Sequence, residues 1–346
     1  MPQFCFSSNT LLHEGRNTPE LIAGHRVAEI FTLLVICHFP SVKTTMGSIT
    51  KSEPSGRLLR GQGPPPTPTP TPQKLFNIVR QKILDAYEFQ DLSFQNISDA
   101  TGELVITSLS EDQDVENACP RLVFLYKSLL WLVFNNYDSI NYNSYTQTLD
   151  IRVMPTFIHD AHQSWLVMEM SRMVSTGFVT QAEFDSVSFL VGTTFRGFQG
   201  RYANSSKEPD TCLLPSSQHF PSIVIETGWA ESWPKLSRDK DLWLQGGCPE
   251  VLLVFLIKWS NITSDRVKGI IEVHQRDSGG TKLLQTEDIF PRPATSSTQS
   301  IPISRQQFLG SNLQAGGNTT QIYELSIDRF REKAEGFIRG KGLTPA

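Results

Sequence analysis

The first helical period in the chain follows the proline-rich stretch near residue 70. It places four apolar side chains on one face, at spacings of three, four and four: Phe76, Val79, Ile83 and Tyr87. Pro120 then precedes an apolar run over 122–134, which predicts a helix buried on most sides. Residues 135–150 are polar and turn-like. The region therefore predicts a small helical domain or a helical cap on the part that follows.

A second helical period lies over about 157–175. Its stripe consists of Ile158, Ala161, Trp165 and Met168. Glu169 falls beside this stripe, and Gly177 is placed to end the helix. This segment predicts a helix that packs on a sheet formed further along the chain.

From about residue 187 the pattern changes from helical to extended. Strands are expected at 187–202 (one long or two short), 221–229, 251–259 and 269–275. A helix is expected at 232–247, between two apolar strands, and such a crossover implies a mixed sheet. Gly279-Gly280 predicts a hairpin turn after the last strand. The fold class is therefore α/β or α+β, with a mixed β-sheet flanked by helices.

Composition divides the chain into four parts. Residues 1–73 end in GQGPPPTPTPTPQ and predict a disordered, low-complexity segment with a Pro-Thr linker. Residues 74–150 form the helical cap region, and 151–290 form the core. Residues 291–346 form a C-terminal extension with a short amphipathic helix, on which Phe330, Ala334 and Phe337 share a face.

Charge and targeting signals limit the class of partner. The chain has a formal charge of −4 and a pI near 6.0, so a strongly basic nucleic-acid or membrane binder is not indicated. No signal-peptide pattern and no apolar run long enough to span a bilayer are found. The five cysteines are scattered without CxxC spacing. These features predict an intracellular protein, cytoplasmic or nuclear, that does not bind a membrane.

Two carboxylates carry the chemistry that the sequence suggests. Asp210 follows Pro209 at the start of a short apolar strand, and Glu226 follows Ile223-Val224-Ile225. If the two segments are neighbouring strands, both side chains reach one end of the sheet. Paired carboxylates beside a backbone carbonyl form an oxygen site of the kind that Mg²⁺ prefers. We therefore expect Asp210 and Glu226 to bind Mg²⁺.

The motifs around these carboxylates resemble the PD-(D/E)XK nuclease superfamily. The resemblance lies in S-K-E-P-D, in P-x-hydrophobic-hydrophobic-hydrophobic-E-x-G, and in S-x-x-K-L-x-x-D-x-x-x-W-L, all within 206–244. Within the superfamily, these motifs are similar in particular to those of the Uma2-like, restriction-endonuclease-like branch and of fungal proteins with a similar core. The resemblance implies a restriction-endonuclease-like core over about 182–275 and metal-dependent hydrolysis of phosphodiester bonds.

One part of the nuclease signature is missing. The family has a lysine two residues after the second carboxylate, where this chain has Gly228. That lysine positions the attacking water and offsets developing negative charge. The resemblance implies Lys235 as its replacement in catalysis. Lys207 and Lys240 are further candidates, with Asp239 of the third motif as a supporting residue.

An acidic residue on the helix before the sheet often faces the site in this family, and Glu169 or Glu183 could take that place.

Other motifs have simpler explanations. Asp277-Ser278-Gly279-Gly280 resembles a protease nucleophile loop but fits a hairpin turn. His159, Asp160 and His162 fit the polar start of a helix, and the tryptophans around the motif fit core packing.

Two functions follow as expectations. The first is a Mg²⁺-dependent nuclease acting on nucleic acid. The second is a catalytically inactive nuclease-fold protein that serves as an interaction module. Residues 182–275 contain eleven acidic and nine basic residues, with no basic stripe to follow a phosphate backbone, which favours the second.

Overall fold

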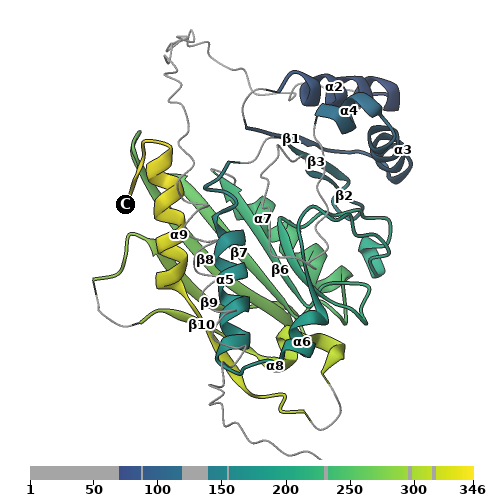
Figure 1. Ribbon diagram of the computed structural model, residues 1–346. Coiled ribbons are helices and arrows are strands. Elements are labelled where there is room, and N and C mark those ends of the chain that lie inside the picture. Colours follow the sequence, from purple (N-terminus) through teal and green to yellow (C-terminus); the bar gives the residue numbers. More distant parts are fainter. Residues whose placement is uncertain are drawn as a thin grey trace, which may run out of the picture. The chain divides into compact units, whose positions relative to one another are not determined.

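The computed structural model describes residues 70–86, 89–118, 139–153, 156–229, 233–294, 298–313 and 317–346 (Figure 1). All of them belong to one unit, Pro66–Ala346. The expectations for 1–69 and for the apolar run 122–134 lie outside these residues. None of the described helices is long and apolar enough to cross a membrane.

A mixed sheet forms the centre of the fold and has the strand order β12-β8-β7-β6-β5-β4, with β9 also paired to β8. Its strands are β4 (Val187–Leu190), β5 (Thr211–Pro215), β6 (Ile223–Trp229), β7 (Leu253–Asn261), β8 (Arg266–Asp277), β9 (Gly280–Phe290) and β12 (Thr344–Pro345). β6 and β7 are parallel because α7 (Trp233–Asp241) crosses between them. The neighbouring pairs β4–β5, β5–β6, β7–β8 and β8–β9 are antiparallel.

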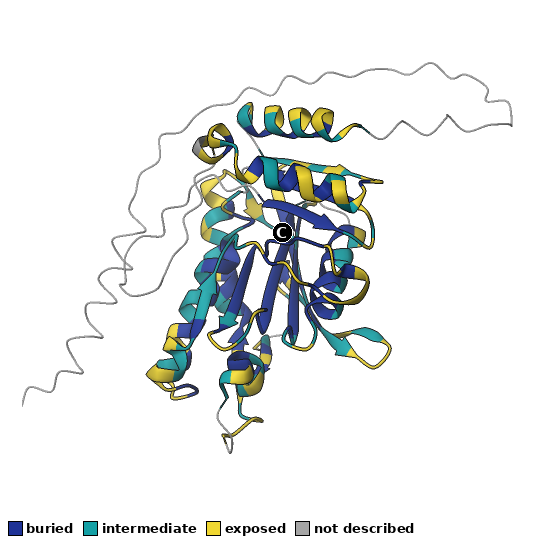
Figure 2. Cartoon of the chain, turned by 90° about the vertical axis from the view of Figure 1, so that its right-hand side faces the viewer, coloured by how far each residue is buried: buried dark blue, intermediate teal, exposed yellow. Residues whose placement is uncertain are grey.

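Helices cover both faces of this sheet, and its strands are largely buried (Figure 2). On one face lie α5 (Ala161–Ser175) and α9 (Ile327–Gly340), where Trp165 stacks on Phe330 with ring centroids 4.7 Å apart. On the other face lie α7 and the π-helical turn Leu242–Gly246. The smaller elements are α6 (Gln181–Asp185), α8 (Arg305–Leu309), β10 (Ser300–Ser304), β11 (Ile322–Ser326) and the 3₁₀ turns Gly200–Tyr202 and Gly310–Asn312.

The N-terminal part of the described chain forms a lobe with a hydrophobic cluster of its own. We call this part, from α2 to β3, the lobe. It contains α2 (Pro72–Leu84), β1 (Gln90–Phe94), α3 (Asp99–Ser110), α4 (Gln113–Ala118), β2 (Ser139–Asn143) and β3 (Thr148–Val153). The three strands form an antiparallel sheet in the order β1-β3-β2.

The turn-like interpretation of 135–150 was wrong, because β2 and half of β3 fall in that range. The region expected as a helical cap thus contains a sheet beside its helices. The polar residues of β2 and β3 become buried when β2 pairs with β3 and β3 pairs with β1, so composition favoured a turn where the fold has strands.

The core matches the sequence expectations more closely. The apolar run 251–259 is a strand, and the hairpin after β8 turns at residues 278–279. The helix expected at 157–175 begins at Ala161 and ends before Gly177, which has a positive φ of 74°. Within 187–202 only Val187–Leu190 is a strand. The helix expected at 232–247 ends at Asp241 and continues as the π-helical turn.

Candidate functional site

Asp210 and Glu226 are brought together by the antiparallel pairing of β5 and β6. The register pairs Thr211 with Ile225 and Cys212 with Val224. One further step of the same register places Asp210 opposite Glu226. Directly opposed residues of an antiparallel pair have their side chains on the same face, a few ångströms apart. The expectation that the two segments are neighbouring strands is therefore confirmed.

Both carboxylate oxygens of Asp210 have protein donors. Arg152 Nη1 of β3 lies 2.5 Å from Oδ1. The backbone N–H of Thr227 donates to Oδ2 at 2.6 Å, and His159 Nε2 lies 3.4 Å from the same oxygen. Asp210 is only 4% exposed. A buried carboxylate with these partners keeps its charge, because each donor stabilises the ionised form.

The electrostatics of this corner follow from that arrangement. Burial opposes ionisation of Asp210, but Arg152 and His159 outweigh it and hold the pKa of the carboxyl well below its usual range. For His159, burial lowers the pKa, but Asp210 and Asp160 raise it by more. The pKa of His159 is therefore raised to about 10. His159 is thus a cation, with Asp160 Oδ1 2.7 Å from its Nδ1.

Glu226 has a different environment from Asp210. Its Oε1 accepts from Trp243 Nε1 at 2.6 Å and lies 3.2 Å from Lys207 Nζ. Its Oε2 is buried and has no hydrogen-bond partner among the described residues. Burial raises the pKa of Glu226 to about 8, Lys207 opposes this shift, and Asp210 and Asp239 add to it. The π-helical turn places Trp243 over Glu226; such turns recur at functional sites.

Lys207 completes the charged centre. Its amine lies 3.2 Å from Glu226 Oε1 and 3.2 Å from Asp239 Oδ2 of α7, and the side chain is 3% exposed. Burial lowers the pKa of Lys207, but the carboxylates outweigh burial and raise it, so the amine stays charged. The set of side chains that meet here is called the ion cluster below: Arg152, His159, Lys207, Asp210, Glu226 and Asp239.

The other predicted site residues have partners elsewhere. Lys235, expected as the catalytic lysine, pairs with Asp91 of β1, so Lys207 is the amine at Glu226. Lys240 pairs with Asp241 at 3.1 Å. The structure thus places the amine of Lys207, three positions before Asp210, beside Glu226.

The two acidic candidates on the preceding helices also lie in other contacts. Glu169 is fully buried between Arg329 and Tyr323, with Oε1 2.6 Å from Arg329 Nε. Glu183 closes a capping box on α6 and pairs with Arg305. Both stabilise the packing of helices, and neither has a contact with the ion cluster among those described.

Mg²⁺ takes oxygen ligands of the type found here: the carboxylates of Asp210 and Glu226 and, beside the ion cluster, the carbonyl of Thr227. In the arrangement described, His159 Nε2 lies 2.9 Å from that carbonyl, and Asp210 is already paired. Glu226 Oε2 has no hydrogen-bond partner within the part of the chain that the structure describes. Among the described residues, no group of three or more His, Cys, Asp or Glu is placed to hold a metal ion. The residues fit the ion in type, and protein cations occupy their oxygens.

Sequence reasoning missed two members of the ion cluster. Arg152 lies at the end of a strand that the composition had not predicted. His159 was interpreted as helix-start polarity, and its spacing to Asp210 gives no signal. Its neighbour His162 lies 2.9 Å from Thr211 Oγ1 and 3.2 Å from Thr227 Oγ1. Burial lowers the pKa of His162 to about 4, so it is neutral.

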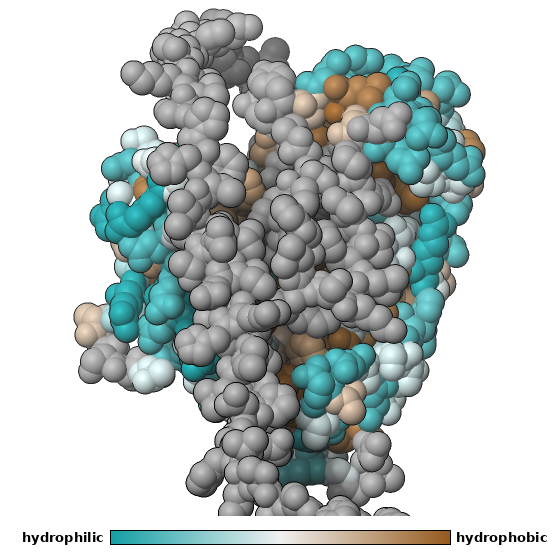
Figure 3. Space-filling view, viewed as in Figure 1, coloured by the Kyte–Doolittle hydropathy of each residue, from teal (hydrophilic) through white to brown (hydrophobic). Residues whose placement is uncertain are grey.

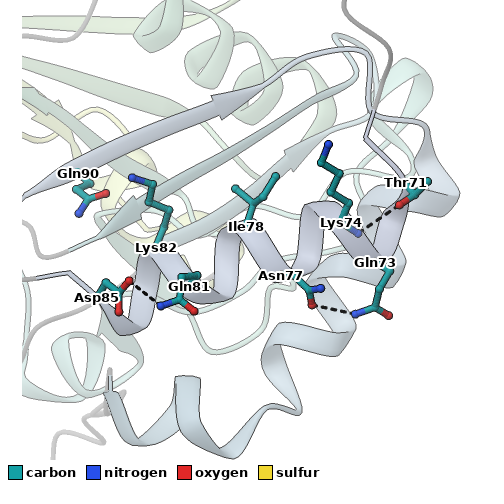
Figure 4. A pocket seen from close by; sticks show the side chains of 9 residues that line it. All are labelled: Thr71, Gln73, Lys74, Asn77, Ile78, Gln81, Lys82, Asp85 and Gln90. Atoms are coloured by element: carbon teal, nitrogen blue, oxygen red, sulfur yellow. Dashed lines mark hydrogen bonds between the residues drawn. The ribbon is translucent and has the colours of Figure 1, made fainter.

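Other surfaces offer less chemistry. An open hollow runs along the outer face of α2, lined by amides, two lysines and the half-exposed Ile78 (Figure 4). Its side chains bond mainly to one another, as Gln81 does to Asp85. On the face seen in Figure 3 the described surface is mostly hydrophilic, with apolar residues visible at the upper right, where the lobe lies. The ion cluster remains the strongest candidate site.

No protein-family model, curated protein or solved structure is significantly similar to this chain.

Proposed function

We propose that the core is a PD-(D/E)XK-like phosphodiesterase that acts on nucleic acid, with Lys207 in the place of the missing motif lysine. The observation that supports this most is the meeting of Asp210, Glu226 and Lys207 at one end of β5 and β6. The order of strand, Pro-Asp, loop, strand with Glu, helix and apolar strand also agrees with the resemblance. The restriction-endonuclease-like fold is part of the same proposal.

Each residue would have a distinct part in the reaction. Asp210 and Glu226 would hold Mg²⁺, which when bound acidifies a water and offsets charge on the phosphate. Lys207 is a charged amine beside Glu226 and would stabilise negative charge that develops on the phosphate. Asp239 holds this amine in place from α7. A buried, pre-oriented cation needs little rearrangement during the reaction.

The second candidate is a catalytically inactive nuclease-fold protein that acts as an interaction module. A specific observation favours it: Arg152, His159 and Lys207 already pair with the carboxylates that a metal would need. In that case the ion cluster fastens the structure and does not catalyse. Removing one partner of such a buried pair lowers the stability of the protein.

Cleavage of a supercoiled plasmid in Mg²⁺ or Mn²⁺ tests the first candidate. The wild type should nick the plasmid, and Lys207→Met and Glu226→Gln should lower the rate by about a hundredfold or more. Lys235→Met is the matched control, because that lysine pairs with Asp91 in the lobe. It should keep most of the activity.

The fold of each variant is checked by circular dichroism before activity is compared. A wild type that is inert with both metals would reject the phosphodiesterase and favour the interaction module. Equal rates for Lys207→Met and the wild type would reject Lys207 as the replacement lysine. A loss in Lys235→Met alone would return that role to Lys235.

A further inference from the structure

The lobe is joined to the core by polar contacts around the ion cluster. Tyr142 and Ser206 exchange backbone hydrogen bonds at 2.7 and 2.9 Å. The side chain of Asn141 accepts from the N–H of Glu208 at 2.7 Å. The hydrophobic cluster of the lobe is separate from the two clusters of the core. Polar interfaces of this type allow two parts of a chain to move relative to each other.

Arg152 is the member of the ion cluster that comes from the lobe. It lies on β3, where Ile151 and Val153 on either side of it are buried in the lobe cluster. Arg152 is 5% exposed, and its guanidinium pairs with Asp210 Oδ1. The lobe therefore fixes a cation on the carboxylate that a metal would need.

A guanidinium and a divalent cation cannot both occupy one carboxylate oxygen. At the close distances of a buried site, the two cations repel each other strongly. Arginine also pairs with phosphate in two-pronged geometry, so a phosphodiester offers Arg152 an alternative anion. Substrate could then draw Arg152 from Asp210 and leave the carboxylate to the metal.

We propose that Arg152 is an autoinhibitory plug: the lobe holds it on Asp210 and excludes Mg²⁺ until a phosphodiester competes for the guanidinium. This rests on the proposed phosphodiesterase function and adds its regulation. The plug makes metal binding depend on substrate, so the centre stays inactive when no nucleic acid is present.

Titration of Mg²⁺ by calorimetry tests the plug. Arg152→Gln should bind Mg²⁺ about tenfold more tightly than the wild type or more. Arg152→Lys keeps the positive charge and should bind Mg²⁺ as weakly as the wild type. Arg80→Gln is the matched control, because Arg80 pairs with Asp112 and Asp114 within the lobe. It should leave the affinity unchanged.

A second measurement uses the wild type and does not depend on the folding of a variant. An oligonucleotide with slowly cleaved phosphorothioate links should raise the Mg²⁺ affinity of the wild type about tenfold. A methylphosphonate oligonucleotide, which lacks the phosphate charge, should not. An unchanged affinity with the charged oligonucleotide, or in Arg152→Gln, overturns the plug.

The outcomes of these experiments distinguish a failure of the plug from a failure of the proposed phosphodiesterase function. Tighter Mg²⁺ binding by Arg152→Gln without cleavage by any variant supports the plug and rejects the phosphodiesterase. Cleavage by the wild type with the same affinity in Arg152→Gln rejects the plug and keeps the enzyme. No Mg²⁺ binding by any of these proteins rejects both.

Discussion

At the residue scale, burial and neighbouring charges determine the ionisation of the carboxyls in the ion cluster. Asp210 is ionised because Arg152, His159 and the Thr227 amide surround it. Glu226, directly across the strand pair, has a raised pKa because it is fully buried. Two carboxyls in neighbouring positions thus have pKa values pushed apart by their surroundings, which is a common property of catalytic centres and also of structural ion networks.

His162 gives a pH-dependent prediction at this scale. Its pKa is about 4 in the folded protein against an ordinary 6.5, so the unfolded chain binds more protons between these values. The contribution of His162 to stability is present above pH 6.5 and is lost as the pH falls toward 4. His162→Gln should therefore flatten the loss of stability over this range, measured by urea unfolding at several pH values.

The largest slope that one proton can give is about 1.4 kcal/mol per pH unit. His219→Gln is the control for the loss of an imidazole, because His219 is exposed. If His162→Gln retains the full slope of the wild type, His162 is not the group that titrates.

At the scale of elements, β7 could be predicted because it is a continuous apolar run, and α5 because its apolar residues follow one helical period. β2 could not, because Asn141 and Asn143 have the composition of a turn and become buried only through pairing with β3 and the contacts to 205–208. The closeness of Asp210 and Glu226 on neighbouring strands could be predicted from the order of the sequence motifs around them. The position of the Lys207 amine could not be predicted, because it depends on the β-bridge between Phe195 and Lys207.

Gly269 in β8 provides a prediction about strand packing. A Cβ built there would lie 2.3 Å from the Trp259 ring, which is fully buried between the sheet and α9. Gly269→Ala should therefore cost about 1–3 kcal/mol in the free energy of unfolding, since Trp259 has no room to move aside. Thermal or urea unfolding measures the loss.

Gly279 in the adjoining hairpin is the matched control, because a Cβ there meets nothing within 4 Å. Gly279→Ala should change stability by no more than about 0.5 kcal/mol. Equal effects of the two substitutions would contradict the close contact between Gly269 and Trp259.

At the scale of the whole molecule, the separate hydrophobic clusters imply that the lobe can open without the core. Leu109→Ala removes a buried side chain from the lobe cluster and should cost about 2–5 kcal/mol locally. In native-state hydrogen exchange, the amides of β3 should then exchange faster, while those of β7 keep the protection of the wild type.

Leu104→Ala on the same helix is the control, since Leu104 is 54% exposed and should leave both sets of amides unchanged. Faster exchange in β7 together with β3 would mean that lobe and core unfold as one unit, against the separation described above.

The indole of Trp243 has a consequence for observing this protein. Because its N–H donates to Glu226 at 2.6 Å, the ring is a built-in optical probe of the charge on that carboxyl. Excitation near the red edge of indole absorption, compared between the wild type and Trp243→Phe, isolates its emission from that of the other tryptophans. A shift of this difference spectrum on adding a divalent ion would report an event at Glu226 directly, without a label and without turnover.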